Sequence, residues 1–355
     1  MNDTLENMSG VIAVHCGAGY HSEKIRRQYN KLSRQACRAS AKILNDGGTS
    51  LEAVKAAITV VLENNSLTNA GKGSNLTIDG YVECDAAIMN GRTLLYGGCG
   101  AIQKVKNPIE LAYEICCKQT QKLPLGLIPP TFLVGNGALK YAKNVGIKTV
   151  PKKYLMSQSS FKRMKKYKAL LEQKTAVEYK DLMDTVGAVC VDKDGHVASG
   201  CSSGGLILKK PGRVGQGALY ACGVWADSFN STSENSVAVS TTGCGEYLIR
   251  TQLAKEIAKD IKHAACPVTT LHKSMIENFI DSRFLWDVSE KLGGALVLHV
   301  KPSKEGHVMW GHSTETMSVG FLNCNDGKAK SVVSKLPMEV SVGSSVSVNG
   351  IDFTL

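Results

Sequence analysis

The sequence predicts an α/β fold in which β-sheets are covered by helices. Short apolar runs that end in small-residue turns, such as 11–15, 186–191 and 236–241, are typical of buried strands. Between them, apolar residues recur at helical spacing, as in 33–45 and 51–62. No internal repeat or change of composition divides the 355 residues. We therefore expect strands and helices to share one core.

Composition narrows the class of protein. Apolar residues make up 43% of the chain and charged residues 21%, which are globular values, and no run of about 18 apolar residues predicts a membrane span. The first residues form neither a basic nor an apolar signal region, so secretion is not expected. The twelve cysteines show no C-x-x-C spacing. This argues against a zinc site and for reduced thiols in a cytosolic or nuclear protein.

The basic charge lies in one segment. Residues 140–184 hold twelve Lys/Arg and four Asp/Glu, so they carry eight of the eleven net positive charges. The nearly neutral remainder argues against direct nucleic-acid binding by the protein surface as a whole. Weak apolar spacing in about 150–184 predicts a flexible, partly helical insert. A basic cluster in it has the composition of either a nuclear-localisation signal or a solvated helix face. Its residues are Lys162, Arg163, Lys165, Lys166 and Lys168.

The first strand, 11–15, runs into a glycine-rich turn that lacks the Lys-Ser/Thr of a phosphate loop. His15 at its end is expected to pack in the core. The helix 33–45 stops at a Gly-Gly pair, and Thr49 with Glu52 forms a capping box for the next helix. Neither helix carries a candidate catalytic residue, so both are expected to be scaffold.

Asp85 lies inside the strand 81–89, where an acid requires a buried partner. The Asn-Gly pair at the end of this strand predicts a type I′ hairpin into a strand over 94–105. Pro108 favours the first turn of a further helix. The remaining elements expected before the insert are a strand over 132–134 and a helix over 136–145.

The junction of Asp184 and Thr185 carries the strongest chemical signal. There the lysine-rich segment meets the buried strand 186–191. A cut between the two residues would give Thr185 a hydroxyl nucleophile and its own amine as a base. An α-amino group has an unperturbed pKa of about 7.7–8, which suits a general base. From these residues alone, the alternative is a threonine that opens an ordinary strand.

After Thr185, strands and small-residue turns alternate closely. A hairpin is expected between 186–191 and 196–201, and a rigid Pro-Gly turn presents Arg213. The strand 236–241 leads to the start of a helix that extends to about residue 260, and such a start can offer N–H donors to an oxyanion. The elements expected beyond it are a helix over 269–281, strands over 294–300, 308–311 and 319–322, and a β-prone tail from 332.

Eight stretches, in the same order, resemble the type 2 (plant-type) asparaginase family of N-terminal-nucleophile hydrolases. They are VHCGAG (14–19), NAGKGS (69–74), CDAAIMNG (84–91), DTVGAV (184–189), SSGG (202–205), GRVGQ (212–216), STTGCGE (240–246) and HSTETM (312–317). Within the family the chain is most similar to the threonine aspartases, or taspases. The stretches that indicate this branch are GKGSNL (71–76), IPPTFLVGNGA (128–138), PGRVGQ (211–216), STTGCGE and the basic insert.

The resemblance implies a four-layer αββα sandwich with two central, mainly antiparallel sheets between helix layers. It also implies a precursor that cuts itself between Asp184 and Thr185. Residues 1–184, including the insert, would form an α subunit and 185–355 a β subunit of one domain. Two such pairs would make an (αβ)2 heterotetramer from a homodimeric precursor. The resemblance implies no cofactor, no metal ion and no membrane partner.

Residue roles come from the matching positions. The implied catalytic residues are Thr185 as nucleophile, Ser203 beside it, Thr242 and Gly243 as oxyanion stabilisers, and Asn69 near the scissile bond. The implied substrate-binding residues are Arg213, which would hold a carboxylate, with Gln216 and Gly245. Asparaginases carry an aspartate at the position of Gln216, where it holds the α-amino group of the substrate. Loss of that charge favours a substrate whose aspartate lies within a peptide chain.

The expected function is therefore a self-cleaving threonine endopeptidase that cuts protein substrates after aspartate in the nucleus or cytoplasm. The resemblance to the taspases implies that the substrates are nuclear transcription regulators, including trithorax-type methyltransferases and TFIIA. The alternative enzyme is an isoaspartyl peptidase/L-asparaginase that acts on small substrates. A third hypothesis is a non-catalytic scaffold whose basic insert binds acidic proteins or nucleic acid.

Overall fold

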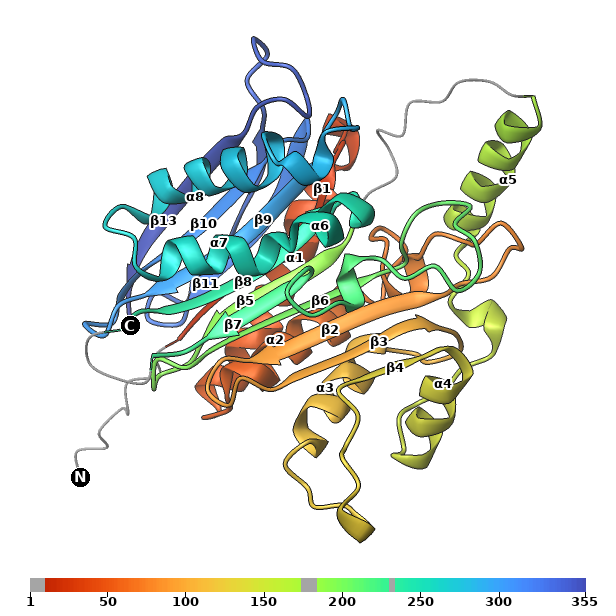
Figure 1. The fold of residues 1–355 in the computed structure, drawn as a ribbon, viewed down its shortest axis with the longest axis horizontal. Helices are drawn as coiled ribbons and strands as arrows, with labels where there is room; N and C mark the ends of the chain where they lie inside the picture. The colour runs from red at the N-terminus through yellow and green to blue at the C-terminus, as the bar shows by residue number, and fades with distance from the viewer. Residues whose placement is uncertain (1–9, 174–183, 230–233) are drawn as a thin grey trace.

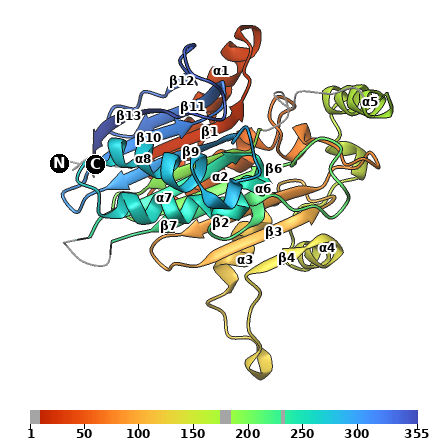
Figure 2. The same cartoon turned by 45° about the horizontal axis from the view of Figure 1, so that its top comes forward.

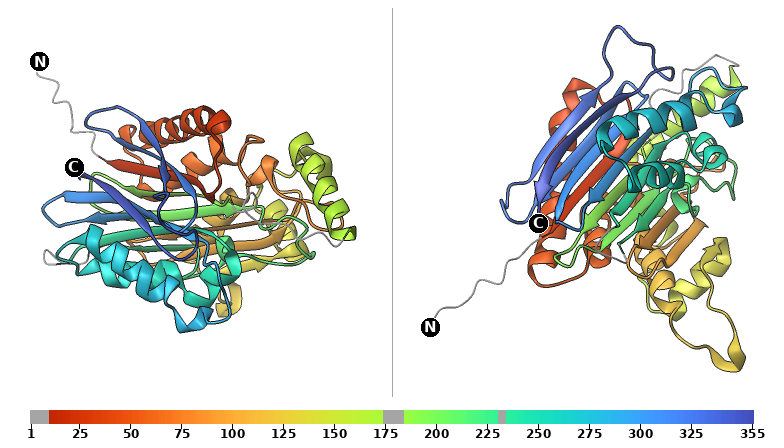
Figure 3. Two further views of the ribbon diagram at one scale, coloured as in Figure 1. Left: turned by 90° about the horizontal axis from the view of Figure 1, so that it is seen from above. Right: turned by 60° about the vertical axis from the view of Figure 1, so that its left-hand side comes forward.

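Two β-sheets packed face to face form the centre of the protein, and helices cover both outer faces (Figures 1 and 3). The computed structural model describes residues 10–173, 184–229 and 234–355. The view from above in Figure 3 shows helices of the first half of the chain on one side of the strands and helices of the second half on the other. The predicted αββα sandwich is confirmed.

The larger sheet has eight strands in the order β12-β11-β1-β5-β6-β2-β3-β4, and the smaller sheet has five in the order β13-β10-β9-β8-β7. Among the described strands every pairing is antiparallel except that of β3 with β4. The strands are β1 Val11–Gly19, β2 Cys84–Asn90, β3 Tyr96–Ile102, β4 Phe132–Val134, β5 Val186–Val191, β6 Val197–Ser203, β7 Val224–Asp227, β8 Ser236–Gly243, β9 Gly293–Val300, β10 Glu305–His312, β11 Thr316–Asn323, β12 Lys330–Lys335 and β13 Ser347–Thr354.

Helices α1, α2 and α3 pack on the larger sheet, and α7 and α8 pack on the smaller one (Figure 1). The predicted capping box is present at the start of α2, where Thr49 and Glu52 bond reciprocally. The helices are α1 Glu23–Asn45, α2 Ser50–Ala57, α3 Pro108–Lys118, α4 Gly135–Asn144, α5 Gln158–Glu172, α6 Gly245–Thr251, α7 Leu253–Lys262 and α8 Pro267–Met275.

Both faces of the inner strands β1, β5, β8 and β9 are buried, which explains why these strands read as continuous apolar runs, whereas the edge strands β12 and β13 are mostly half-buried or exposed. In β1, Ile12 and Val14 pack in the cluster beneath the helices of the larger sheet, whereas Val11 and Ala13 pack in the cluster between the sheets. Successive side chains of a strand point to opposite faces, so covering both faces favours apolar residues at every position.

The hairpin after β2 differs from the prediction. β2 pairs with β3 as expected, but the connection is longer than two residues, and Asn90 Oδ1 accepts a hydrogen bond from Arg92 N at 2.9 Å. A type I′ turn requires positive φ at both central residues. Here Leu94, with φ 59°, has the positive φ, and Gly91 does not. The side-chain turn at Asn90 replaces the expected backbone turn.

The helix expected to run on to about residue 260 is broken. Gln252 adopts φ 48° and separates α6 from α7. Lys255 N beyond the break donates to Ala221 O at 3.1 Å, a contact with a distant loop. No glycine or proline marks this position, so local sequence could not indicate the break.

The described part of the basic insert is a docked helix rather than a linker. Helix α5 lies at the periphery of the molecule, far from the C-terminus (Figures 1 and 2). Met164 is buried in the core beneath it, and Arg163 Nη1 donates to Asn75 Oδ1 at 2.9 Å. The lysines of the predicted nuclear-localisation cluster are exposed, as on a solvated face. Nuclear import stays a prediction, and the end of the insert, 174–183, lies outside the described residues.

All twelve cysteines are free and eight are buried, as expected for core thiols. None of the described helices is long and apolar enough to cross a membrane. Among the residues that the structure describes, no three His, Cys, Asp or Glu side chains are grouped as a metal site.

Candidate active site

Thr185 is buried at the start of β5, with 3% of its surface exposed. Its Oγ1 donates a hydrogen bond to Ser203 Oγ at 3.2 Å and accepts one from Gln216 Nε2 at 3.0 Å. Ser203 ends β6, the neighbour of β5, and Gln216 begins a short 3₁₀ turn. Three predicted site residues therefore meet at one hydroxyl, which is held in a defined orientation.

Asn69 supports this cluster through the loop that follows β6. Its Nδ2 donates to Gly205 O at 2.8 Å, and its backbone carbonyl accepts from Gly204 N at 2.7 Å. Gly205 N in turn donates to Ser203 Oγ at 3.0 Å. Asn69 is thus connected to the nucleophile through Ser203.

Asp85 holds the turn that carries Arg213. Its Oδ2 accepts from Gly215 N and its Oδ1 from Ala101 N, both at 2.9 Å. Burial raises the pKa of this carboxyl, against the opposing charge of Lys209. The predicted need for buried partners is met by backbone donors from β3 and from the turn that carries Arg213.

Arg213 lies beside the cluster, with its guanidinium bonded to Glu246 through two nitrogens at 2.8 and 2.7 Å. A Cβ atom on Gly245 would lie 2.7 Å from Arg213 Nη2 and 2.8 Å from Gln216 Oε1. Gly245 therefore gives Arg213 and Gln216 the space to approach one another. Glu246 was not among the predicted site residues, because a glutamate in the first turn of a helix is also ordinary helix chemistry.

Thr242 and Gly243 reach the same end of the sandwich on β8. Ala18 N donates to Thr242 Oγ1 at 3.3 Å, and His15 of the same strand β1 is paired with Gly187 of β5. Because β5 runs antiparallel to β1, its first residues lie near Ala18. Within the described residues, neither Thr242 nor Gly243 shares a hydrogen bond with Thr185.

Asp184, before the predicted cut, is held by residues of the first half of the chain. Tyr29 Oη donates to Asp184 Oδ2 at 3.4 Å, and His21 Nε2 lies 3.8 Å from Asp184 Oδ1. Gly17, with φ 112°, lies so close that a Cβ there would be 2.9 Å from Asp184 Cα. Gly17 belonged to a recognised turn, but no sequence signal marked His21 or Tyr29.

His15 is a buried core residue, as predicted. Its Nε2 is 2.9 Å from Ser240 Oγ. Burial lowers the pKa of His15 to about 3, an effect larger than the opposing backbone hydrogen bond with Thr185. The imidazole is therefore neutral at physiological pH and lies beneath the site as packing.

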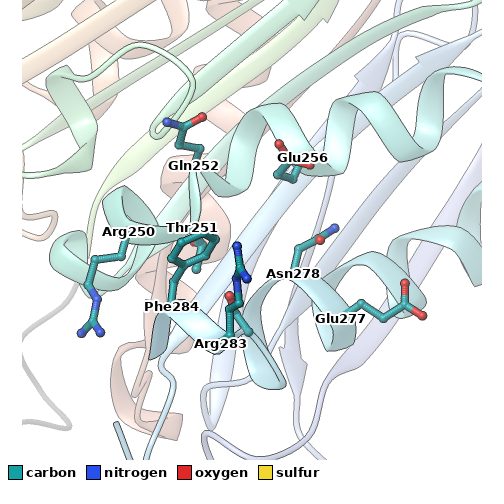
Figure 4. Close-up of a pocket in the computed structure, with 9 residues that line it drawn as sticks. Arg250, Thr251, Gln252, Glu256, Glu277, Asn278, Arg283 and Phe284 are labelled. Atoms are coloured by element: carbon teal, nitrogen blue, oxygen red, sulfur yellow. The ribbon is translucent and has the colours of Figure 1, made fainter. Parts of the chain in front are cut away.

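A pocket of about 550 Å³ lies elsewhere, at the break between α6 and α7, and charged side chains of both signs surround it (Figure 4). Its lining residues are Arg250, Thr251, Gln252, Glu256, Glu277, Asn278, Ser282, Arg283 and Phe284. None of these lining residues shares a hydrogen bond with Thr185, Ser203 or Gln216. Chemistry rather than cavity size therefore locates the candidate site.

Glu63 is buried behind the site, and from its burial we expect the stability of the folded protein to depend on pH. Burial raises its pKa to about 8, against hydrogen bonds from Ser202, Ile109 N and Asn107. Because the carboxyl of Glu63 holds its proton more tightly in the folded chain than in the unfolded one, it stabilises the fold. This contribution is fully present below the pKa of the unfolded state, near 4.5, and is lost as pH rises through the pKa of the folded state, about 8. In this window we expect the free energy of unfolding to fall by up to about 1.4 kcal/mol per pH unit from this group.

Replacing Glu63 by glutamine should flatten this pH dependence, because the amide does not titrate. Denaturant unfolding of both proteins between pH 5 and about 8 measures it. Replacing the exposed Glu290 by glutamine controls for loss of one carboxyl. Equal slopes for wild type and Glu63→Gln would contradict the prediction.

A sandwich of this kind, in which a buried threonine opens a central strand and receives polar contacts on its hydroxyl, defines the class: this is an N-terminal-nucleophile hydrolase. A family model described as Asparaginase matches residues 8–332. The chain belongs to that asparaginase family.

Named relatives narrow the comparison further. The human isoaspartyl peptidase/L-asparaginase is 32% identical over 329 residues, which cover 90% of this chain and 95% of that protein. The zebrafish (Danio rerio) protein of the same name is 36% identical over 263 residues, or 73% of this chain and 78% of that protein. The Xenopus laevis protein, again of that name, is 36% identical over 276 residues.

These relatives correct the functional prediction. The expected aspartate-specific endopeptidase acting on nuclear regulators is wrong, because similar proteins over most of the chain are isoaspartyl peptidases/L-asparaginases. The family assignment holds, but the comparisons do not support the narrower assignment to the taspases. The endopeptidase prediction rested on short motifs, the basic insert and the replacement of an aspartate by Gln216, and in the structure the Gln216 amide donates to Thr185 Oγ1.

Proposed function

We propose that this protein is an N-terminal threonine hydrolase that cleaves β-aspartyl amide bonds in isoaspartyl peptides and asparagine. The observation that carries the proposal is the buried Thr185 hydroxyl, which is bonded to both Ser203 and Gln216. The guanidinium of Arg213 beside it suits a substrate carboxylate. The names of the relatives supply the small β-aspartyl substrates.

Activation would begin with a cut between Asp184 and Thr185. The two halves would stay joined, because they share the larger sheet: β1 lies between β11 and β5, and β2 pairs with β6. Residues 1–184 and 185–355 would thus become α and β subunits of one domain. Assembly of two such pairs remains a prediction.

In the cut enzyme the free amine of Thr185 would take the proton of its own hydroxyl. The oxygen would attack the β-carbonyl carbon, and the developing oxyanion would be stabilised by the Thr242 hydroxyl and the Gly243 N–H. The C–N bond would then break, and the amine would leave with the proton. Water would hydrolyse the ester on Thr185 and release aspartate.

A substrate comparison tests the proposal. Self-cleaved enzyme is incubated with a β-aspartyl dipeptide, free asparagine, and a peptide containing an ordinary α-linked aspartate, and released aspartate and new peptide ends are measured. We expect hydrolysis of the first two substrates and an intact third. Turnover of the α-linked peptide alone would overturn the proposal.

A further inference from the structure

The guanidinium of Arg213 is already bonded along one of its edges. Its Nε and Nη2 donate to Glu246 Oε1 and Oε2 at 2.8 and 2.7 Å, a bidentate arrangement. The Arg213 side chain is 15% exposed and that of Glu246 is 48% exposed. Burial raises the pKa of Glu246, but the hydrogen bonds and charge of Arg213 lower it below its usual range. Glu246 therefore acts as a carboxylate at neutral pH.

Three glycines surround the remaining edge of the guanidinium. A Cβ atom on Gly205 or on Gly215 would lie 2.8 Å from Arg213 Nη1, and one on Gly245 would lie 2.7 Å from Nη2. Because glycine has no side chain, none of these three residues covers this edge. No hydrogen-bond acceptor for Nη1 is present among residues 10–173, 184–229 and 234–355.

This second edge lies beside groups that contact the nucleophile. Gly205, next to Nη1, donates its N–H to Ser203 Oγ. Gly245, next to Nη2, is equally close to the side chain of Gln216. Since Ser203 and Gln216 both bond to Thr185 Oγ1, the Nη1–Nη2 edge lies beside the groups that hold the reacting hydroxyl.

We propose that Glu246 is a positioning residue for substrate binding. It holds the Nε–Nη2 edge of Arg213 so that the Nη1–Nη2 edge receives the α-carboxylate of an aspartyl substrate. This role rests on the proposed function, in which Arg213 binds that carboxylate. A guanidinium takes a carboxylate through two N–H groups in a plane, so its rotation decides whether the second edge can bind.

The experiment compares two substrates in wild type and Glu246→Gln. One is a β-aspartyl dipeptide with a free aspartyl α-carboxylate, and the other is the same dipeptide with that group converted to an amide. For Glu246→Gln we expect KM for the acid substrate to rise roughly tenfold, because an unheld arginine must be ordered on binding. Its kcat should stay within about twofold, and KM for the amide should not change.

Asp287→Asn is a matched control. It disrupts the bidentate pair of Arg250 and Asp287. Arg250 belongs to α6, as Glu246 does, and the side chain of Asp287 is 45% exposed, a fraction similar to the 48% of Glu246. It should behave as wild type with both substrates. Kinetics are normalised to the amount of self-cleaved chain measured by mass spectrometry. Glu246→Asp keeps the charge on a shorter side chain and should raise KM for the acid substrate only. This variant replaces Glu246→Gln in the experiment if the glutamine variant does not fold.

Three results would overturn the role of Glu246. A lower KM for the acid substrate would mean that Glu246 competes with substrate for Arg213. An unchanged KM would mean that Arg213 needs no support. Equal changes with both substrates would indicate a structural defect. By contrast, a wild-type enzyme that hydrolyses neither substrate refutes the proposed function itself, and this positioning role with it.

Discussion

Replacing Thr185 by alanine is expected to leave the chain uncut and without hydrolase activity. The substitution removes the hydroxyl that donates to Ser203 and accepts from Gln216, and no other group replaces it as the nucleophile. Loss of a nucleophile typically costs about 10⁴-fold or more in kcat. Intact mass after incubation at neutral pH should show one chain for the variant and two fragments for wild type, ending at Asp184 and starting at Thr185.

Thr185→Ser is the matched variant for this experiment, because it keeps the hydroxyl and loses only a methyl group. It should still produce both fragments, at a reduced rate. Thermal unfolding of all three proteins verifies that the alanine variant is folded. A Thr185→Ala chain that is cut at the same bond would show that another residue attacks it. A wild-type chain that stays uncut would mean that folding alone does not trigger cleavage.

Replacing Gly17 by alanine is expected to block or strongly slow self-cleavage while Thr185 itself is unchanged. An added Cβ would lie 2.9 Å from Asp184 Cα, a distance that real Cβ atoms essentially never show, and 3.0 Å from Asp184 Cβ. Asp184 would have to move away from β1, and the scissile bond would move with it. A displacement of about 1 Å in a reacting group can cost roughly 10²-fold in rate.

Gly47→Ala provides the control for backbone strain. Gly47 also has a positive φ, 81°, but a Cβ there meets nothing within 4 Å. Both variants carry the cost of a positive φ on alanine, of order 1 kcal/mol. Only Gly17→Ala displaces Asp184. If intact-mass time courses show the two variants cutting at the same rate, contact with Gly17 does not position Asp184.

The candidate site shows where reasoning from the sequence succeeded. Thr185, Ser203, Gln216 and Arg213 came from matched motifs, and the structure places them together. The sequence placed Gln216 among the substrate-binding residues but could not show that its amide donates to Thr185 Oγ1. An amide that donates to the nucleophile has a different chemical consequence from a missing charge near the substrate.

Other members of the site had no local signal. Tyr29 and Asp184 are 155 residues apart, and Arg213 and Glu246 are 33 apart. A tyrosine or a glutamate on a helix surface is common, so its residue type does not single it out. Only the packing of α1 and α6 against the strands brings these side chains to the cluster.

By itself, the sequence determined the elements that depend on interactions within a few residues. Thr49 and Glu52 cap α2, Pro108 begins α3, and the apolar run after Thr185 forms β5, all as predicted. Capping bonds and side-chain periodicity act over one or two turns, so they can be read locally. Tertiary structure alone decided the position of β1 between β5 and β11, the break at Gln252 and the pairing of Arg213 with Glu246. Each of these depends on burial and contacts between distant parts of the chain, which form only when the two sheets pack together.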